Sequence, residues 1–305
     1  MSRTAVIAVG GNSLITDKEH QTVPDQFQAA AETCRHVAAL FEEPGLRVVV
    51  THGNGPQVGL LALQNAFYAH VPQFTLDVLG AQTQGMIGYL IEIELRNALE
   101  RPQMMTTVLT LTEVDAADPA FAHPTKFVGP IYTDAEAAAL AQVRGWTFGD
   151  DGGHARRVVA SPRPQRVIQV DSTKKLLAAG HIVVASGGGG IPVARDADGH
   201  YAGVEAVVDK DASSAVLAAH VGADVFVLAT DADAVMLDWG TPDARPLRRA
   251  SVGELAGYEF AAGSMGPKVD AAADFVRRSG KRAVIGRIDD LPGLLAGDSG
   301  TSVVP

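Results

Sequence analysis

The sequence is poor in cysteine and in long apolar runs. Cys34 is the only cysteine among the 305 residues, which excludes a disulfide bond within the chain and a zinc site built from cysteines. No stretch approaches the roughly 20 apolar residues of a membrane-spanning helix. Because the apolar run near Met1 is also too short for a signal peptide, we expect a cytoplasmic protein without a membrane partner.

Basic residues are outnumbered by acidic ones. The chain has 25 lysines and arginines against 35 aspartates and glutamates, which gives a net charge of −10. Such a chain has no broad basic surface to attract nucleic acid, so nucleic acid is not expected as a partner. A phosphate substrate would instead need a local cluster of cations.

Several common catalytic motifs are missing. The sequence has no Gly-x-x-x-x-Gly-Lys-Ser/Thr loop, no Gly-x-Gly-x-x-Gly fingerprint, no Gly-x-Ser-x-Gly turn, and neither the Asp-Phe-Gly nor the His-Arg-Asp triplet of protein kinases. Its nine histidines do not fall at metal-ligand spacings, and His52 and His123 are expected to be surface or hydrogen-bonding residues. We therefore assign no metal ligand to the chain.

Glycine and polar clusters, in contrast, follow four apolar runs of strand length. The clusters are Gly10-Gly11-Asn12, His52-Gly53-Asn54-Gly55, Ser186 to Gly190, and Thr230 to Asp233. Glycine lets a ligand approach backbone amides closely, and such amides bind anions. Because ligands of α/β proteins lie beyond the carboxyl ends of the strands, we expect the four clusters to meet at one edge of a sheet.

Strand-like runs alternate with helical patterns along the chain. The alternation predicts an α/β fold whose mostly parallel sheet is covered by helices on both faces. Residues 104–111 and 166–170 are predicted as strands, whereas 115–164, with five prolines, is expected to be a peripheral excursion. The helix predicted at 79–100 is apolar over much of its circumference, so it is either buried or covered by a partner subunit.

Three lysines occur in distinctive local sequences: Lys126 in Pro-Thr-Lys, Lys210 in Asp209-Lys-Asp211, and Lys268 in Gly-Ser-Met-Gly-Pro-Lys. A lysine held between two carboxylates stays charged, which suits a contact with phosphate. Phosphoryl transfer needs cations and amide donors more than a nucleophile, because its transition state spreads negative charge over the transferred group. The alternative is a flexible glycine linker beside a solvated charge cluster.

The sequence resembles the carbamate kinase family of the amino-acid kinase superfamily along its whole length. The resemblance rests on Gly-Gly-Asn-Ser-Leu (10–14), Thr-His-Gly-Asn-Gly-Pro-Gln-Val-Gly (51–59), Gln-Thr-Gln-Gly-Met-Ile-Gly-Tyr (82–89), Pro-Thr-Lys (124–126), Gly-Gly-Gly-Gly-Ile-Pro-Val (187–193), Gly-Val-Glu-Ala-Val-Val-Asp-Lys-Asp (203–211) and Gly-Ser-Met-Gly-Pro-Lys (263–268). The blocks at 51–59 and 187–211 are highly specific within the superfamily.

The resemblance implies a three-layer α/β/α sandwich. Residues 1–195 would form an N-terminal lobe that binds the phosphoryl acceptor, and residues 196–305 a C-terminal lobe that binds the nucleotide. A small subdomain near 117–165 would protrude over the active site, and the helix at 79–100 would help to bury a homodimer interface. The implied reaction is ATP + carbamate ⇌ ADP + carbamoyl phosphate, with Mg²⁺, in arginine breakdown.

The resemblance also assigns roles to individual residues. Carbamate or carbamoyl phosphate would be bound by Gly10, Gly11, Asn12, Gly53, Asn54, Gly188 and Gly189. Lys210 and Lys268 would flank the transferred phosphoryl group, held by Asp209 and Asp211, while Lys126 would reach in from the protrusion. ATP or ADP would be bound by Thr230, Asp231, Asp233, Met265 and Lys268.

Some positions depart from the family pattern. Phe127 stands where the family usually has proline, Glu259 stands where it often has histidine, and 153–160 differs from the usual Gly-Arg-Gly-Trp-Arg segment. These positions lie on or near the expected protrusion. They therefore bear on which acceptor the protein phosphorylates more than on phosphoryl transfer itself. A related kinase with another small acid as acceptor and a non-catalytic sensor of nucleotide or carbamoyl phosphate therefore stay open as alternatives.

Overall fold

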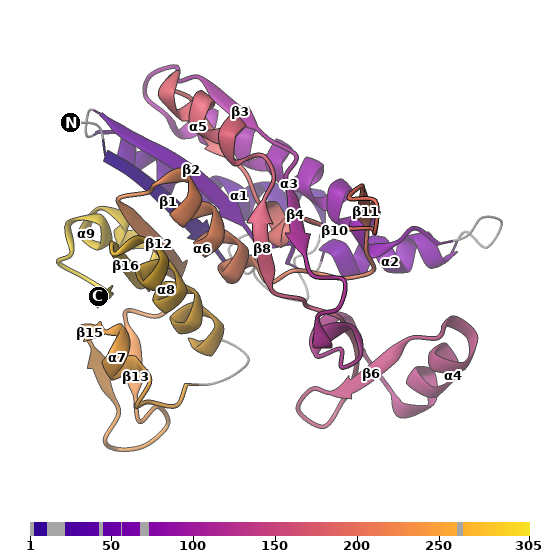
Figure 1. The fold of residues 1–305 in the computed structure, drawn as a ribbon. Coiled ribbons are helices and arrows are strands. Elements are labelled where there is room, and N and C mark those ends of the chain that lie inside the picture. Colours follow the sequence, from indigo (N-terminus) through magenta and orange to yellow (C-terminus); the bar gives the residue numbers. More distant parts are fainter. Residues whose placement is uncertain (1–2, 11–21, 43–44, 56, 68–72, 261–264) are drawn as a thin grey trace.

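The computed structural model describes residues 3–10, 22–42, 45–55, 57–67, 73–260 and 265–305. Its centre is an eight-stranded sheet (Figure 1) in which all neighbouring strands are parallel except β16 and β17. In spatial order the strands are β15 (Arg249–Ser251), β17 (Thr301–Val304), β16 (Arg282–Arg287), β12 (Val225–Thr230), β1 (Arg3–Val9), β2 (Leu46–His52), β9 (Ile182–Val184) and β3 (Met105–Thr107).

Helices cover both faces of this sheet, which confirms the predicted three-layer α/β/α sandwich. Alternate residues of β1 enter two separate cores: Val6 and Ala8 lie in one, and Ala5, Ile7 and Val9 in the other. This is the period-two alternation of a strand that is buried on both sides. The first core is closed by α5 (Val170–Ala178), α6 (Lys210–Val221) and α8 (Met265–Ser279), and the second by α1 (Val23–Ala38), α3 (Leu76–Ala98) and α9 (Leu291–Ala296).

Three smaller sheets surround the central one. Residues 119–159 form a projecting subdomain (Figure 1) with a sheet of β5 (Lys126–Tyr132), β7 (Ala155–Val159) and β6 (Thr147–Asp150) and the helices η3 (Pro119–Phe121) and α4 (Asp134–Arg144). The second sheet has the order β11 (Tyr201–Gly203), β10 (Ile191–Arg195), β4 (Leu111–Val114), β8 (Pro164–Val167), and the third pairs β13 (Val235–Leu237) with β14 (Arg245–Leu247).

The strand predicted at 166–170 overlaps β8, which lies in the four-stranded sheet and not in the central one. The prediction of a single strand at 104–111 was wrong, because this run is divided between β3 in the central sheet and β4 in the four-stranded sheet. The reason lies at Thr110, whose backbone N–H and C=O are both bound by the side-chain amide of Gln84 at 2.9 and 3.0 Å. The Thr110 carbonyl also accepts from the Ile191 amide of β10 at 2.8 Å, so at this residue the chain leaves the central sheet and joins the four-stranded sheet.

The remaining described elements are the helices α2 (Gln57–Phe67) and α7 (Val252–Leu255) and the short 3-10 turns η2 (Ala39–Glu42), η4 (Gly187–Gly189) and η5 (Ile288–Asp290). A capping box begins α7, since the Ser251 hydroxyl accepts from the Glu254 amide at 3.2 Å and the Glu254 carboxylate accepts from the Ser251 amide at 2.7 Å. Among the described residues, no helix has the length and apolar character needed to cross a bilayer.

Candidate active site

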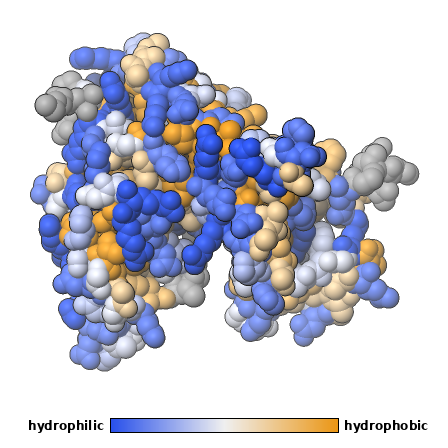
Figure 2. Space-filling model, in the orientation of Figure 1, coloured by the Kyte–Doolittle hydropathy of each residue, from blue (hydrophilic) through white to orange (hydrophobic). Residues whose placement is uncertain are grey.

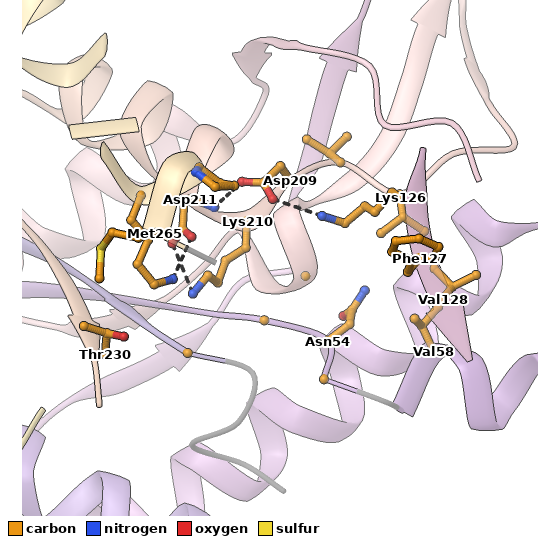
Figure 3. Close-up of a pocket in the computed structure, with 18 of the residues that line it drawn as sticks. Asn54, Val58, Lys126, Phe127, Val128, Asp209, Lys210, Asp211, Thr230 and Met265 are labelled. Atoms are coloured by element: carbon orange, nitrogen blue, oxygen red, sulfur yellow. Dashed lines mark hydrogen bonds and ion pairs between the residues drawn. The ribbon is translucent and has the colours of Figure 1, made fainter. Parts of the chain in front are cut away.

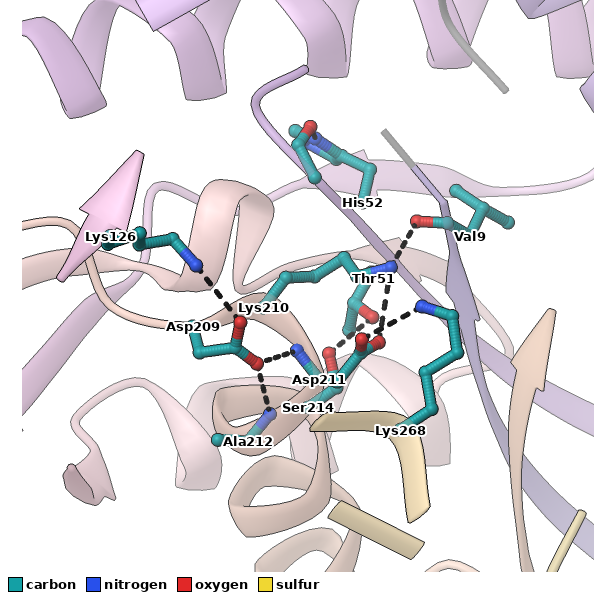
Figure 4. A network of polar contacts seen from close by, with 11 residues as sticks. Val9, Thr51, His52, Lys126, Asp209, Lys210, Asp211, Ala212, Ser214 and Lys268 are labelled. Carbon is teal, nitrogen blue, oxygen red and sulfur yellow. Dashed lines mark hydrogen bonds and ion pairs between the residues drawn. The ribbon is translucent and has the colours of Figure 1, made fainter. Parts of the chain in front are cut away.

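The N-terminus of α6 holds the first charged group of the site. Asp209 is the N-cap of this helix, and its Oδ1 accepts hydrogen bonds from the amides of Asp211 and Ala212 at 2.9 and 3.1 Å. Its Oδ2 accepts from Lys126 Nζ at 3.0 Å (Figure 4), so a carboxylate on the body binds a lysine of the projecting subdomain. Both oxygens of Asp209 are therefore engaged.

Asp211 lies between the other two lysines that the sequence singled out. Its Oδ1 is 3.1 Å from Lys210 Nζ and its Oδ2 is 3.0 Å from Lys268 Nζ (Figure 4). Lys210 Nζ also donates to the carbonyl oxygen of Val9, at the end of β1, at 3.1 Å. One carboxylate thus fixes two ammonium groups that come from α6 and α8.

The pKa values in this cluster reflect its burial. Burial lowers the pKa of Lys210, an effect that Asp211 opposes and the positive charge of Lys268 reinforces. Burial alone would raise the pKa of Asp209, but the neighbouring ammonium group of Lys126 and the amide hydrogen bonds hold it below its ordinary value. Asp209 is therefore an anion at neutral pH, and Lys210 titrates at lower pH than a solvated lysine.

The glycine turns of β2 and β9 pack directly against each other. Gly188 has φ of +63°, and a Cβ atom built on it would lie 2.0 Å from Asn54 Oδ1. That oxygen accepts a hydrogen bond from Thr83 Oγ1 at 2.8 Å. Only glycine fits at position 188, because both the backbone conformation and the contact with Asn54 exclude a side chain.

His52 is buried at the start of the first of these turns, and it has a partner that the sequence did not reveal. Its Nδ1 lies 2.9 Å from the carbonyl oxygen of Gly53. Burial lowers the pKa of His52 to about 4. The imidazole is thus neutral at physiological pH and supports the turn without adding charge to the site.

Buried hydroxyl groups join α6 to the strand ends. Thr51 Oγ1 lies 2.6 Å from Ser214 Oγ, and Ser186 Oγ lies 2.7 Å from Ser213 Oγ. Sequence reasoning missed this layer. The available signal was the Ser213-Ser214 pair, which interrupts an otherwise apolar helix and is fully buried. These contacts hold Lys210 in a fixed position relative to the glycine turns.

The four predicted strand ends surround one cavity of about 420 Å³ (Figure 3), which opens into the hollow between the subdomain and the C-terminal elements (Figure 2). Of the predicted residues, Gly10, Gly53, Asn54, Lys126, Gly188, Asp209, Lys210, Asp211, Thr230, Asp231, Met265 and Lys268 line it. Arg156 and Phe127 also line it, and sequence reasoning assigned no role to Arg156.

A second, larger hollow of about 810 Å³ adjoins the first. The two share Thr230, Asp231 and Met265, and the second has aromatic walls that include Trp239, Tyr258 and Phe260. A polar cavity that carries three lysines therefore continues into an apolar one. This division suits a ligand with a phosphate end and a flat organic end.

Among the described residues, two predicted site residues line neither cavity. Gly189 is buried behind the turn, and its carbonyl oxygen accepts from Thr112 Oγ1 at 2.8 Å. Asp233 is outside both linings and accepts from Arg248 Nη2 at 2.6 Å. Gly11 and Asn12 lie outside the described residues.

Comparison with known proteins assigns this arrangement to a family. The model of the amino acid kinase family matches residues 3–287. The chain is 47% identical over 298 residues to a carbamate kinase of Haemophilus influenzae, covering 98% of this chain and 96% of the relative, and 43% identical to one of Pyrococcus furiosus over the full length of both. A carbamate kinase of Giardia lamblia bound to AMP-PNP superposes with a TM-score of 0.91 at 36% identity, covering 99% of this chain and 98% of that one. The chain therefore belongs to the amino acid kinase family and, within it, to the carbamate kinases.

Proposed function

We propose that the protein catalyses ATP + carbamate ⇌ ADP + carbamoyl phosphate. The bond between the γ-phosphorus and the ADP oxygen breaks, and a bond forms between that phosphorus and a carbamate oxygen. The observation that carries the proposal is the convergence of Lys126, Lys210 and Lys268 on one cavity that opens into an aromatic hollow. The relationship to carbamate kinases over nearly the whole chain supports it.

The catalytic task is to position two anions and to neutralise the charge between them. Lys210 and Lys268, fixed by the single carboxylate of Asp211, are placed to contact the transferred phosphoryl group from one side. Carbamate already carries a negative oxygen, so no general base is needed. Asp209 is in any case unsuited to that role, because both its oxygens are engaged by amides and Lys126.

Lys126 is the cation that the subdomain contributes. Its Nζ lies 3.0 Å from Asp209 Oδ2. A phosphoryl group that arrives between them would compete for the ammonium group with a carboxylate of like charge. We infer that Lys126 transfers from Asp209 to the substrate as the cavity fills.

The two cavities suggest how the substrates divide between the lobes. Carbamate or carbamoyl phosphate would bind at Gly10, Gly53, Asn54 and Gly188, in the N-terminal lobe of residues 1–195. The adenine ring of the nucleotide would occupy the aromatic hollow of the C-terminal lobe, residues 196–305. Thr230, Asp231 and Met265, which line both cavities, would then lie near the phosphates.

The residues present fit a Mg²⁺ ion that arrives with the nucleotide. Asp209 and Asp211 are occupied by lysines, whereas Asp231 lines the junction of the cavities and forms no ion pair with any other described residue. Mg²⁺ is commonly held by one or two carboxylates together with substrate phosphates. Asp231 and the nucleotide would hold the ion, which would reduce the charge of the phosphates.

A homodimer is part of the proposal. The apolar side chains Val78, Tyr89 and Leu109 are 40%, 56% and 55% exposed on or beside α3. This helix lies next to β3, the edge strand of the central sheet. A second copy of the chain would cover this face. Arginine breakdown in the cytoplasm, in the direction of ATP formation, is the expected setting.

The decisive test is ATP formation from ADP, Mg²⁺ and carbamoyl phosphate by the purified protein. We expect Lys210→Ala to lower kcat by about 10²–10³-fold, because the variant loses a cation that contacts the transferred group. A circular dichroism spectrum equal to that of the wild type would show that the variant is folded. An active Lys210→Ala variant contradicts the role of Lys210. A folded wild type that binds ADP but forms no ATP contradicts the reaction, and a screen of other small acids then identifies the acceptor.

A further inference from the structure

A separate cavity of about 530 Å³ lies between the β6 and β7 strands of the projecting subdomain, the second half of α2 and the start of α3. It shares no described lining residue with the active-site cavity. The wall between the two cavities is an apolar cluster, whose members Val58, Val128 and Val207 line the active site while Leu76 and Val159 line the second cavity. A ligand could therefore occupy one cavity without entering the other.

The second cavity contains an arginine whose charge is poorly compensated. The Arg157 side chain is only 12% exposed, and its guanidinium lies over the Trp146 ring, 4.1 Å from the centroid. Within the described part of the chain, its one ion-pair partner is Glu205, at a long 3.5 Å, and no hydrogen bond to the guanidinium is found. A guanidinium has five N–H donors, and a buried cation is costly unless it is paired and hydrogen-bonded.

Glu205 is not free to compensate for this deficit. Its Oε2 accepts from the amide of Leu76 at 2.7 Å, and its side chain is half exposed. Burial lowers the pKa of Arg157, which is the expected sign of a cation that lacks a close counter-charge. At the rim, Arg144 donates only to the carbonyl oxygen of Ala66 among the described groups, at 3.0 Å. Two arginines thus face one cavity with a single, distant carboxylate.

We propose that this cavity is a second anion site, which takes a small organic anion with one carboxylate or phosphate group. Arg157 would bind the charged group with its unused donors, and Arg144 would contact it from the rim. The volume falls within the range of small-molecule sites and exceeds what a bare inorganic ion requires. Phe74 and Phe121 supply apolar wall for the organic body of the ligand.

The site is connected to the catalytic cations through short stretches of chain. Arg157 is in register with Val128 on β5, the strand that begins with Lys126. On the other wall, Glu205 precedes Asp209 by four residues, and the Val207 amide donates to the Ala160 carbonyl at 2.9 Å. An anion on Arg157 would compete with Glu205, and it would thereby act on the two chain segments that carry Lys126 and Asp209.

Trp146 provides a direct measure of binding, because the chain has only one other tryptophan. In a Trp239→Phe background, Trp146 emission is recorded during titration with malate or with glycerol 3-phosphate, against NaCl of equal ionic strength. We expect a saturable change with at least one probe. A response to malate alone identifies a carboxylate site, and a response to glycerol 3-phosphate alone identifies a phosphate site.

Matched variants separate this site from the active site. Arg157→Gln should raise the Kd about 10-fold or more, because the substitution removes one charged contact with the anion. Arg144→Gln should weaken binding by a smaller factor. If Arg157→Gln does not fold, the Kd of Arg144→Gln tests whether the anion binds in this cavity. Lys210→Ala should leave the titration unchanged. The absence of a saturable change with both probes overturns the proposal, and so does a response that is lost in Lys210→Ala but retained in the arginine variants. Neither result depends on whether the protein phosphorylates carbamate.

Discussion

At the scale of single residues, Asp211 has the largest influence on the site. Its two oxygens fix Lys210 and Lys268, and its negative charge raises the pKa of Lys210 against the effects of burial and of Lys268. An ordinary lysine titrates near 10.5, and the Lys210 pKa lies below that value. Activity should therefore fall on the alkaline side as Lys210 loses its proton. This fall should begin at a lower pH than it would if the group were a solvated lysine.

This argument predicts a shift in the pH profile of Asp211→Asn. The substitution removes the carboxylate that holds the proton on Lys210, so the alkaline limb of kcat/KM should move to lower pH than in the wild type. The profile of kcat/KM is the relevant measurement because it reports on groups of the free enzyme. Asp196→Asn, which removes an exposed carboxylate from the β10–β11 hairpin, is the control and should leave the limb unchanged. An unshifted limb in Asp211→Asn would show that another group limits the rate.

At the scale of elements, the position of Lys126 depends on how the subdomain sits on α2. Gly59 of α2 and Gly129 of β5 are in direct contact, since a Cβ atom built on Gly59 would lie 2.3 Å from the Gly129 Cα. Gly129 has φ of +71°, at a place where the β5–β7 register shifts. Two glycines thus allow the backbones of α2 and β5 to be in direct contact. The contact point on β5, Gly129, follows Lys126 by three residues.

We therefore predict that Gly59→Ala lowers the free energy of unfolding by about 1–3 kcal/mol, because the added methyl group separates α2 from β5. It should also raise the KM for carbamoyl phosphate, since Lys126 moves with β5. Gly80→Ala is a matched control in α3, where an added Cβ meets no atom within 4 Å, and it should be neutral or slightly stabilising. Urea denaturation and steady-state kinetics measure the two effects. Equal stability of Gly59→Ala and the wild type would contradict the close contact.

The elements also show how far sequence reasoning extends. The ends of β1, β2, β9 and β12 could be placed around one site because parallel strands bring their carboxyl ends to a common edge. The exit of the chain at Thr110 could not be predicted, because it depends on a side chain 26 residues away. The Thr51–Ser214 and Lys126–Asp209 contacts join residues 163 and 83 positions apart, and no local pattern reports such pairs.

At the scale of the whole molecule, the family resemblance predicted which lysines line one cavity. The positions of other residues around that cavity could be found only from the structure. Arg156 lines the active-site cavity while donating to the Gly129 carbonyl at 2.9 Å and to Asp151 at 2.8 Å. Asp233, predicted to contact the nucleotide, is outside both cavity linings and is paired with Arg248. Within one cluster at a strand end, Asp231 lines the cavity and Asp233 does not. Which residue of such a cluster lines the cavity depends on the conformation of the turn.

The exposed face around α3 leads to a prediction about assembly. Leu109 is 55% exposed and borders a shallow hollow with Gly85, Tyr89 and Ile93. Exposed apolar side chains with a polar rim commonly mark a subunit interface, and a twofold axis would place the same face of a second copy against this one. We expect multi-angle light scattering to give twice the mass of one chain. Leu109→Asp should shift the protein towards the mass of a single chain, because it places a carboxylate in the covered face.

Val143→Asp is the matched control for this experiment. Val143 is 76% exposed on α4 of the subdomain, and the same change there should leave the mass unaltered. A wild-type mass of one chain would contradict the dimer. Dissociation by Val143→Asp but not by Leu109→Asp would place the interface on the subdomain. That result would also change the picture of catalysis, since a subdomain held by a partner could not carry Lys126 towards and away from Asp209 independently of the second subunit.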